Sequence, residues 1–185
     1  ARIGLCARER GCEHLKRFLR QETIKKRILG SATAINVGGL PLGSPPTTVA
    51  HGLLVVGDAA GQVKPTSGGG IYPGLVAAKI AGGVAAAAAL EGDGSVQSLQ
   101  EYDRIWRANL GRELEIGMRA NRMLNRMSAK ELDEVVSYLA GKPRLITTIE
   151  EHGDIDRPSR LIVKMLRYLD WNGLKLAGLL HYALG

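Results

Sequence analysis

The stretch from His51 to Leu90 constrains the fold most, because a buried-strand pattern, a glycine-rich loop and a long helical run follow one another there. Its early part, Leu53 to Val56, is a short apolar run bounded by glycines, which is typical of a strand buried on both faces of a parallel sheet. Three consecutive glycines, 68–70, then precede the helical run. This order predicts an α/β arrangement.

A carboxylate follows the predicted strand at its carboxyl end, where Asp58 comes directly after Gly57. Ligands of open α/β sheets bind outside the carboxyl ends of the strands, so Asp58 is placed to accept hydrogen bonds from sugar-like hydroxyls. A turn or a helix cap explains the same spacing equally well, and both interpretations stay open from the residues alone.

The glycines at 68–70 are typical of a backbone that passes close to a bound group. A helix that begins there directs its free N–H groups and its positive dipole end toward that group. A flexible surface turn is the alternative, but Pro65 and Pro73 stiffen the loop from both sides. We therefore expect a ligand-binding loop.

The helix predicted over 71–90 carries a row of small residues at intervals of four. These residues are Gly74, Ala78, Gly82 and Ala86. Small side chains in one row allow another backbone to approach, so this row is predicted to pack against a sheet or another helix. A helix dimer within a bilayer is the less favoured alternative, because Lys79 lies in the same run.

The first part of the chain is predicted to contain both strand and helix. Residues 1–5 alternate weakly, as in a strand, whereas Cys12 to Leu29 has the apolar spacing of a helix. Residues 31–40 are small and β-branched, which predicts a strand that ends in a turn. The proline-rich stretch 41–48 is predicted to be a loop.

From residue 96 onward the pattern is helical. A long helix is predicted over 96–127, with Glu115 and Arg119 as a favourable charge pair one turn apart. Ser128 and Glu131 have the spacing of a capping box, which predicts the start of the next helix.

Two further features lie near the carboxyl end. A turn at 153–159 contains a proline suited to the first turn of a helix. The last segment, 161–184, is apolar but interrupted by charges. We expect it to pack on its own protein rather than to lie on a membrane, which is the alternative.

Composition excludes several classes of protein. With 45% apolar and 23% charged residues, the chain differs from disordered chains, and two cysteines are too few for a disulfide-stapled miniprotein. The longest apolar stretch is interrupted by Lys79 and falls short of the roughly 18 residues of a membrane span. The first residues also lack the pattern of a secretory signal.

The net charge of +7 is concentrated in residues 1–30, which hold nine basic and three acidic side chains. Aromatic stacking platforms and known nucleic-acid motifs are missing there, so a solvated helix face is favoured and no nucleic-acid partner is predicted. Cys6 and Cys12 lack further ligands for zinc and are expected to be small buried thiols.

The run from Gly57 to Tyr72, GDAAGQVKPTSGGGIY, resembles the second flavin motif of the geranylgeranyl reductase family. Members of that family are FAD enzymes with the p-hydroxybenzoate hydroxylase type of fold. The part KPTSGGGI narrows the resemblance toward the archaeal members. Looser matches occur at Gly38–Pro41, at Tyr102 with Trp106, and at Gly153–Ser159.

The resemblance implies an α/β fragment of this fold with an all-helical carboxyl-terminal region. Residues 1–50 would be the end of the substrate, or catalytic, sheet domain with one helix. Residues 51–92 would be the last strand and helix of the FAD-binding domain, and 93–185 the helical region. Because the chain has no initiator Met and no Gly-x-Gly-x-x-Gly fingerprint, we expect a carboxyl-terminal fragment that alone binds FAD weakly or not at all.

The resemblance also implies a cofactor site. Asp58 corresponds to the residue that hydrogen-bonds the ribityl chain of FAD, while Gly70 and Ile71 correspond to the helix start that faces the pyrimidine edge of the flavin. The implied cofactor-binding residues are Gly57, Asp58, Pro65, Gly68, Gly69, Gly70 and Ile71. No metal site is implied.

The implied activity is reduction of the C=C bonds of geranylgeranyl chains in archaeal ether-lipid precursors by reduced FAD. A cytoplasmic location with peripheral membrane contact would suit such a prenyl-lipid substrate. The residues identify neither a catalytic proton donor nor the electron donor. Two alternatives stay open: a flavin-dependent monooxygenase or halogenase of the same fold, and a non-enzymatic basic helical module that binds anionic lipid or nucleic acid.

Overall fold

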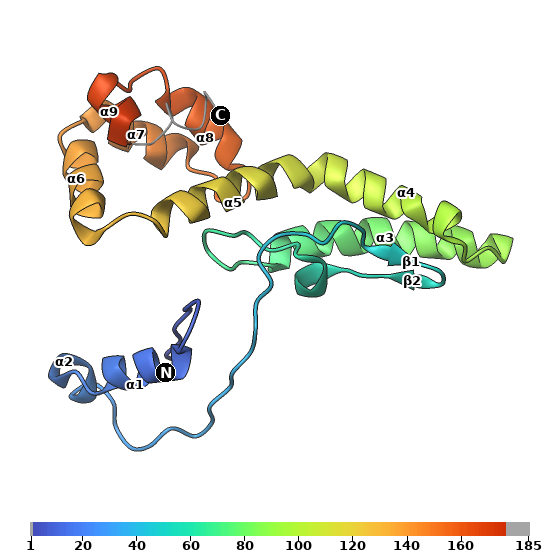
Figure 1. Ribbon diagram of the computed structural model, residues 1–185, viewed down its shortest axis with the longest axis horizontal. Coiled ribbons are helices and arrows are strands. Elements are labelled where there is room, and N and C mark those ends of the chain that lie inside the picture. Colours follow the sequence, from blue (N-terminus) through green and yellow to red (C-terminus); the bar gives the residue numbers. More distant parts are fainter. Residues whose placement is uncertain (1, 177–185) are drawn as a thin grey trace. The chain divides into compact units, whose positions relative to one another are not determined.

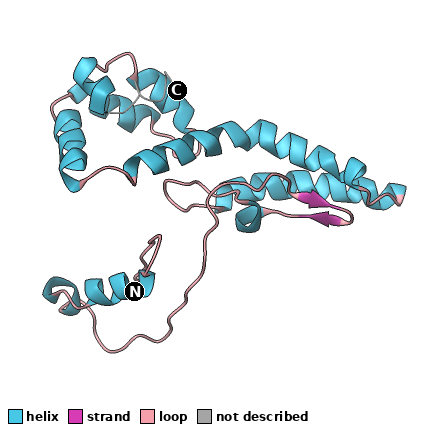
Figure 2. Cartoon of the chain, viewed as in Figure 1, coloured by secondary structure: helices cyan, strands magenta, loops and turns pink. Residues whose placement is uncertain are grey.

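The computed structural model describes residues 2–176, which are mostly helical with one small sheet (Figure 2). The chain divides into two compact units, Ala1–Gly39 and Leu40–Gly185, and each unit is considered by itself. The second unit contains every predicted cofactor-binding residue.

The first unit contains two short helices, α1 (Gly11–Leu19) and α2 (Glu22–Lys25). The single helix predicted over 12–29 is therefore wrong, because extended backbone at Gln21 separates the two helices. The strands predicted at 1–5 and 31–40 are also wrong within the described residues, which have no regular structure there. A strand needs a partner for its backbone groups, and neither segment has one among the described residues.

The cysteines of the first unit differ from the prediction as well. Cys6 and Cys12 are free and exposed rather than buried. Cys12 lies in the first turn of α1, which buries no residue, and Cys6 precedes this helix in a segment without regular structure, so neither thiol meets an apolar interior. No group of three or more metal-ligating side chains occurs in the part of the chain that the structure describes.

The second unit begins with the predicted loop at 41–48 and then forms a hairpin of β1 (Val49–Ala50) and β2 (Leu53–Leu54). The strands are antiparallel, with Val49 opposite Leu54, and Val55 N donates to Thr48 O at 2.8 Å. The expectation of a parallel-sheet strand buried on both faces is wrong for the described residues, since Leu53 is 52% exposed. A four-residue apolar run does not specify its partner.

Helix α3 (Ile71–Glu91) follows the three glycines, as predicted, and lies beside α4 (Val96–Trp106) (Figure 1). A short turn joins the two helices, so they run antiparallel. Their contact forms the main core with β1. The buried members of this core are Val49, Ala77, Ala81, Ala88, Leu99, Tyr102, Trp106 and Leu110.

Within the row of small residues on α3, the predicted close backbone contact occurs at Gly74, where an added Cβ atom would lie 3.6 Å from the Cα atom of Gly57, but not at the other three positions. Ala78, Gly82 and Ala86 are exposed, and the buried row lies one residue earlier, at Pro73, Ala77 and Ala81. The reason is that the small side chains of Ala77 and Ala81 let α4 pack closely on their face of α3. The aromatic side chains of α4, Tyr102 and Trp106, fill the space on that face.

Among the described residues, α3 is the one helix long and apolar enough to cross a membrane, with a mean hydropathy of 1.6. Length and composition alone are weak grounds for a membrane span, because core helices pass the same test. Only 22% of this apolar stretch is buried among the described residues, on the side of α3 that packs against α4.

The long helix predicted over 96–127 is confirmed as a continuous helical stretch. It consists of α4, a π-helical segment η2 (Arg107–Gly111) and α5 (Arg112–Leu124). The predicted pair within α5 is also present, because Arg119 Nη2 lies 2.6 Å from Glu115 Oε1.

The remaining helices are α6 (Ala129–Ala140), α7 (Pro143–His152), α8 (Pro158–Met165) and α9 (Trp171–Leu176). The capping box of Ser128 and Glu131 is formed at the start of α6. Pro158 occupies the first turn of α8, as predicted. The segment predicted over 161–184 is divided between α8 and α9, and its part after 176 lies outside the described residues.

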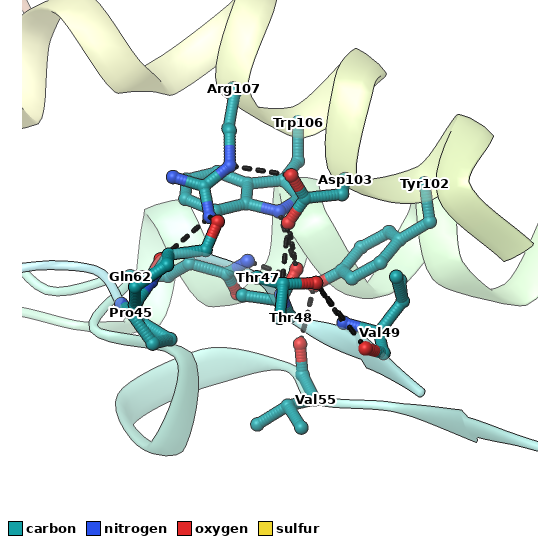
Figure 3. Close-up of polar contacts among 11 residues, drawn as sticks. Pro45, Thr47, Thr48, Val49, Val55, Gln62, Tyr102, Asp103, Trp106 and Arg107 are labelled. Carbon is teal, nitrogen blue, oxygen red and sulfur yellow. Dashed lines mark hydrogen bonds and ion pairs between the residues drawn. The ribbon is translucent and has the colours of Figure 1, made fainter. Parts of the chain in front are cut away.

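A polar network fixes the loop before β1 to α4 (Figure 3). Trp106 Nε1 donates to Thr48 Oγ1 at 2.9 Å, and Thr48 donates to Asp103 from its N–H at 3.0 Å and from its hydroxyl at 2.5 Å. Arg107 bridges Asp103, at 2.6 Å, and the carbonyl of Pro45, at 2.7 Å. Burial raises the pKa of Asp103, but the hydrogen bonds from Arg107 and Thr48 outweigh it and hold that pKa below its ordinary value.

Candidate functional site

The structure brings five of the seven predicted cofactor-binding residues into one open depression of about 550 Å³ at the start of α3. We call it the α3 depression. It is lined by Asp58, Gly68, Gly69, Gly70, Ile71, Gly74 and Leu75. Gly74 and Leu75 are not among the predicted residues, although they follow Ile71 at the helical spacing that brings side chains to the same face.

Gly57 does not line the α3 depression but shapes the turn that carries Asp58. The turn is a short 3₁₀ helix, η1 (Gly57–Ala60), in which Gly57 has a φ of +73°. This left-handed backbone conformation favours glycine over any residue with a side chain. Within the turn, Gly61 N donates to Asp58 O at 2.9 Å, so the main chain folds back immediately after the carboxylate.

The carboxylate of Asp58 lies directly against the backbone of Gly70. A Cβ atom added at Gly70 would overlap Asp58 Oδ1, so this position accommodates only glycine without movement of the carboxylate. Neither η1 nor α3 has a side-chain cap in the described structure, and the residues at their cap positions are Val56 and Gly70. Asp58 therefore does not act as a helix cap, which was one of the alternatives that its position in the sequence allowed.

The start of α3 offers backbone donors beside this carboxylate. The first hydrogen bond of the helix runs from Gly74 N to Gly70 O at 2.8 Å. The N–H groups of Ile71 and Tyr72 precede it and have no partner within a regular helix. The first turn of α3 contains no acidic residue, so no side chain of the helix itself offsets its positive end.

Pro65 does not line the α3 depression either, and instead contacts α5. Asn121 Nδ2 donates to Pro65 O at 2.8 Å, and a Cβ atom added at Gly117 would come within 3.0 Å of Pro65 Cδ. Next to it, Lys64 Nζ forms an ion pair with Asp156 Oδ1 at 2.7 Å. The glycine-rich loop is thereby held by α5 and by the turn between α7 and α8.

These loop contacts bring together segments that sequence reasoning did not connect. Lys64 and Asp156 are 92 residues apart, and Asn121 is 56 residues from Pro65. The turn containing Asp156 is itself tied to α5, because Ser159 donates to Glu113 from its hydroxyl at 2.5 Å and from its N–H at 3.1 Å. Local sequence patterns do not predict which residues pair over such long separations in the chain.

Comparison with known proteins shows similarity to archaeal reductases. The chain is 37% identical to digeranylgeranylglycerophospholipid reductase 2 of Methanothermobacter thermautotrophicus, over 77% of this chain and 37% of that protein. It is 39% identical to digeranylgeranylglycerophospholipid reductase of Methanocaldococcus jannaschii, over 75% of this chain and 37% of that protein.

A further relative matches a larger share of the chain. The uncharacterized protein MJ1520 of Methanocaldococcus jannaschii is 37% identical, over 91% of this chain and 43% of that protein. The chain thus spans less than half the length of these curated relatives. No family model and no solved structure matches the chain. By sequence, the chain is homologous to a segment of archaeal digeranylgeranylglycerophospholipid reductases, which is consistent with a partial geranylgeranyl reductase-like protein.

Proposed function

We propose that this chain is the carboxyl-terminal part of a flavoprotein that uses reduced FAD to reduce C=C bonds in the geranylgeranyl chains of archaeal ether-lipid precursors. The observation that carries the proposal is the placement of Asp58 against Gly70 at the start of α3. This placement occurs in a chain whose relatives are named as digeranylgeranylglycerophospholipid reductases. We use the term parent protein for the full-length protein that contains this segment.

The residues of the α3 depression fit FAD on a structural ground. The absence of a side chain at Gly70 lets the Asp58 carboxylate lie beside the first turn of α3, so hydrogen-bond acceptors and backbone donors are adjacent. Such a pair suits a ligand that carries hydroxyl groups next to a carbonyl-bearing ring edge, as FAD does at its ribityl chain and pyrimidine ring. Adjacent acceptors and donors with this chemistry support the cofactor assignment.

Each residue then has a defined binding role. Asp58 would accept hydrogen bonds from ribityl hydroxyls, while the N–H groups at the start of α3 would donate to the pyrimidine edge of the flavin. The positive end of α3 would favour negative charge on that edge. FAD supplies the reducing electrons when bound, and these residues position it.

The fold we propose for the parent protein is the p-hydroxybenzoate hydroxylase type. Residues 51–92 would be the last strand and helix of its FAD-binding domain, 1–50 the end of its substrate domain and 93–185 its helical region. The relatives are more than twice as long as the matched segment, which leaves room for the dinucleotide-binding part. We accordingly propose that the chain alone binds FAD weakly or not at all.

The substrate class sets the proposed location. A prenyl lipid must be drawn from a membrane, so we propose a cytoplasmic protein with peripheral membrane contact. The names of the relatives favour a reductase over a monooxygenase or halogenase of the same fold, and over a non-enzymatic basic module.

Product analysis tests the proposed reaction. The parent protein, loaded with FAD and reduced chemically without oxygen, is expected to convert geranylgeranyl ether phospholipids into products whose mass rises by one hydrogen molecule per double bond. The matched control is FAD reduced in the same way without protein. An oxygenated or halogenated product, formed only when oxygen is admitted, would contradict the proposal and favour the other flavoenzymes of this fold.

A further inference from the structure

A chain of hydrogen bonds runs from α4 to the turn that carries Asp58, and Figure 3 shows its members Tyr102, Gln62 and Val55. Tyr102 Oη donates to Val55 O at 2.7 Å and accepts from Gln62 Nε2 at 2.8 Å. Gln62 Oε1 in turn accepts from Gly57 N at 2.6 Å. Both side chains are fully buried, with 0% of their surface exposed.

The direction of these bonds is set by the chemistry of the groups. The backbone N–H of Gly57 can only donate, so the Gln62 amide must present its oxygen there and its nitrogen to Tyr102. The carbonyl of Val55 can only accept, so the Tyr102 hydroxyl must donate to it. Burial raises the pKa of Tyr102, which keeps this hydroxyl protonated and able to donate.

The side chains of Tyr102 and Gln62 bind the backbone on either side of Val56, directly before the Gly57–Asp58 turn. Val55 O and Gly57 N are separated by a single residue, and Asp58 follows directly. The main chain of Gln62 also donates to Gly57 O at 3.1 Å, so Gln62 binds Gly57 twice. A shift of Gln62 and Tyr102 would therefore move Asp58 relative to Gly70. The Asp58 carboxylate lies so close to Gly70 that even an added Cβ atom would overlap it.

We propose that Gln62 and Tyr102 are positioning residues that set the Gly57–Asp58 turn for FAD binding. The inference rests on the proposed function, because it takes the α3 depression as the flavin site. Neither residue lines that depression, so both act through Gly57 and Asp58. Tyr102 reaches the turn from 40 residues further along the chain, which couples the helical region to the cofactor site.

The first test replaces Tyr102 with phenylalanine in the parent protein and measures the Kd for FAD by fluorescence quenching. Tyr102→Phe leaves both Val55 O and Gln62 Nε2 without their buried partner, and we expect the Kd to rise about 10-fold. Trp106→Phe is the matched control. It removes an equally buried hydrogen bond one turn further along the same helix, but its partner is Thr48, outside the turn.

A second variant makes the Kd for FAD depend on pH, which a loss of stability alone would not do. In Gln62→Glu, an ionised carboxylate would draw hydrogen bonds from both Gly57 and Tyr102, which deprives Val55 O of its donor. A protonated carboxyl group can instead donate to Tyr102 and restore the native pattern. Burial raises the pKa of a glutamate, so protonation should begin in the mildly acidic range.

The expected result is a pH-dependent defect. The ratio of the Kd of Gln62→Glu to that of the wild type should be about 10 at roughly pH 8 and fall toward one at roughly pH 5.5. If the wild-type parent protein binds no FAD, the proposed function itself fails. If the wild type binds FAD but the Gln62→Glu ratio is flat with pH, or Trp106→Phe weakens binding as much as Tyr102→Phe, the positioning role is overturned.

Discussion

Replacing Gly70 with alanine is expected to raise the Kd of the parent protein for FAD about 100-fold, because hydrogen bonds to a charged group such as the Asp58 carboxylate contribute about 1.5–3 kcal/mol and about 1.4 kcal/mol is a factor of ten in Kd. The added Cβ atom would overlap Asp58 Oδ1, so either the carboxylate or the first turn of α3 must move. Both are proposed to contact the flavin, and movement of either one removes a hydrogen-bonding partner. Equilibrium titration with FAD, followed by flavin fluorescence, measures the change.

Gly83→Ala is the matched control for this prediction. Gly83 lies on the same helix, and an added Cβ atom would meet nothing within 4 Å. Alanine also has the higher helix propensity, so α3 itself should not be weakened. If Gly70→Ala binds FAD as tightly as Gly83→Ala, the contact between Asp58 and Gly70 is not part of the FAD site, and this prediction is wrong.

Trp106→Ala is expected to lower the free energy of unfolding by about 3–5 kcal/mol, the usual cost of removing a large aromatic side chain from a core. Trp106, at the end of α4, is fully buried, and its indole N–H donates to the Thr48 hydroxyl in the loop before β1. The guanidinium carbon of Arg107 also lies 4.6 Å from the centroid of its ring. The substitution therefore removes apolar contacts, a hydrogen bond and a cation–π contact together.

Urea unfolding of the parent protein, followed by circular dichroism, measures this loss. Trp171→Ala provides a comparison, because Trp171 is 69% exposed in α9 and its removal should change the free energy of unfolding by less than about 0.5 kcal/mol. Equal losses for the two tryptophans would show that Trp106 is not part of the core on which the hairpin and α4 are assembled.

Local patterns in the sequence predicted several helices of the second unit well, although the helix predicted over 12–29 is divided into α1 and α2. The long helix predicted over 71–90 is α3, Ile71–Glu91, and the capping box of Ser128 and Glu131 marks the start of α6. In both cases the groups that decide the structure lie within a few residues of one another. Propensity, capping and helical spacing are therefore sufficient to place such elements.

Patterns that depend on a distant partner were less informative. The apolar run from Leu53 to Val56 suggested a parallel sheet, but β2 pairs with β1 in an antiparallel hairpin. The small-residue row of α3 suggested a contact face, whereas α4 packs on the neighbouring row that includes Ala77 and Ala81. In each case the sequence showed an element that could pack, and long-range contacts determined what packed against it.

The candidate site shows the same division. Asp58 and Gly68–Ile71 are close in sequence, so a single motif was enough to predict that they would lie together. Gln62 with Tyr102 and Lys64 with Asp156 are separated by 40 and 92 residues, and only the folded chain brings them together. Most residues that line the α3 depression were therefore predictable, while the residues that hold the loop in place were not.

Hydrogen–deuterium exchange of the parent protein, with and without FAD, tests the central claim that this segment contains the flavin site. Backbone N–H groups between residues 57 and 72 are expected to exchange more slowly when FAD is bound, with the strongest protection at Gly70, Ile71 and Tyr72 at the start of α3. These donors have no partner within a regular helix, so a ligand that accepts from them should protect them. FAD-dependent protection elsewhere, with unchanged exchange over residues 57–72, would contradict the account.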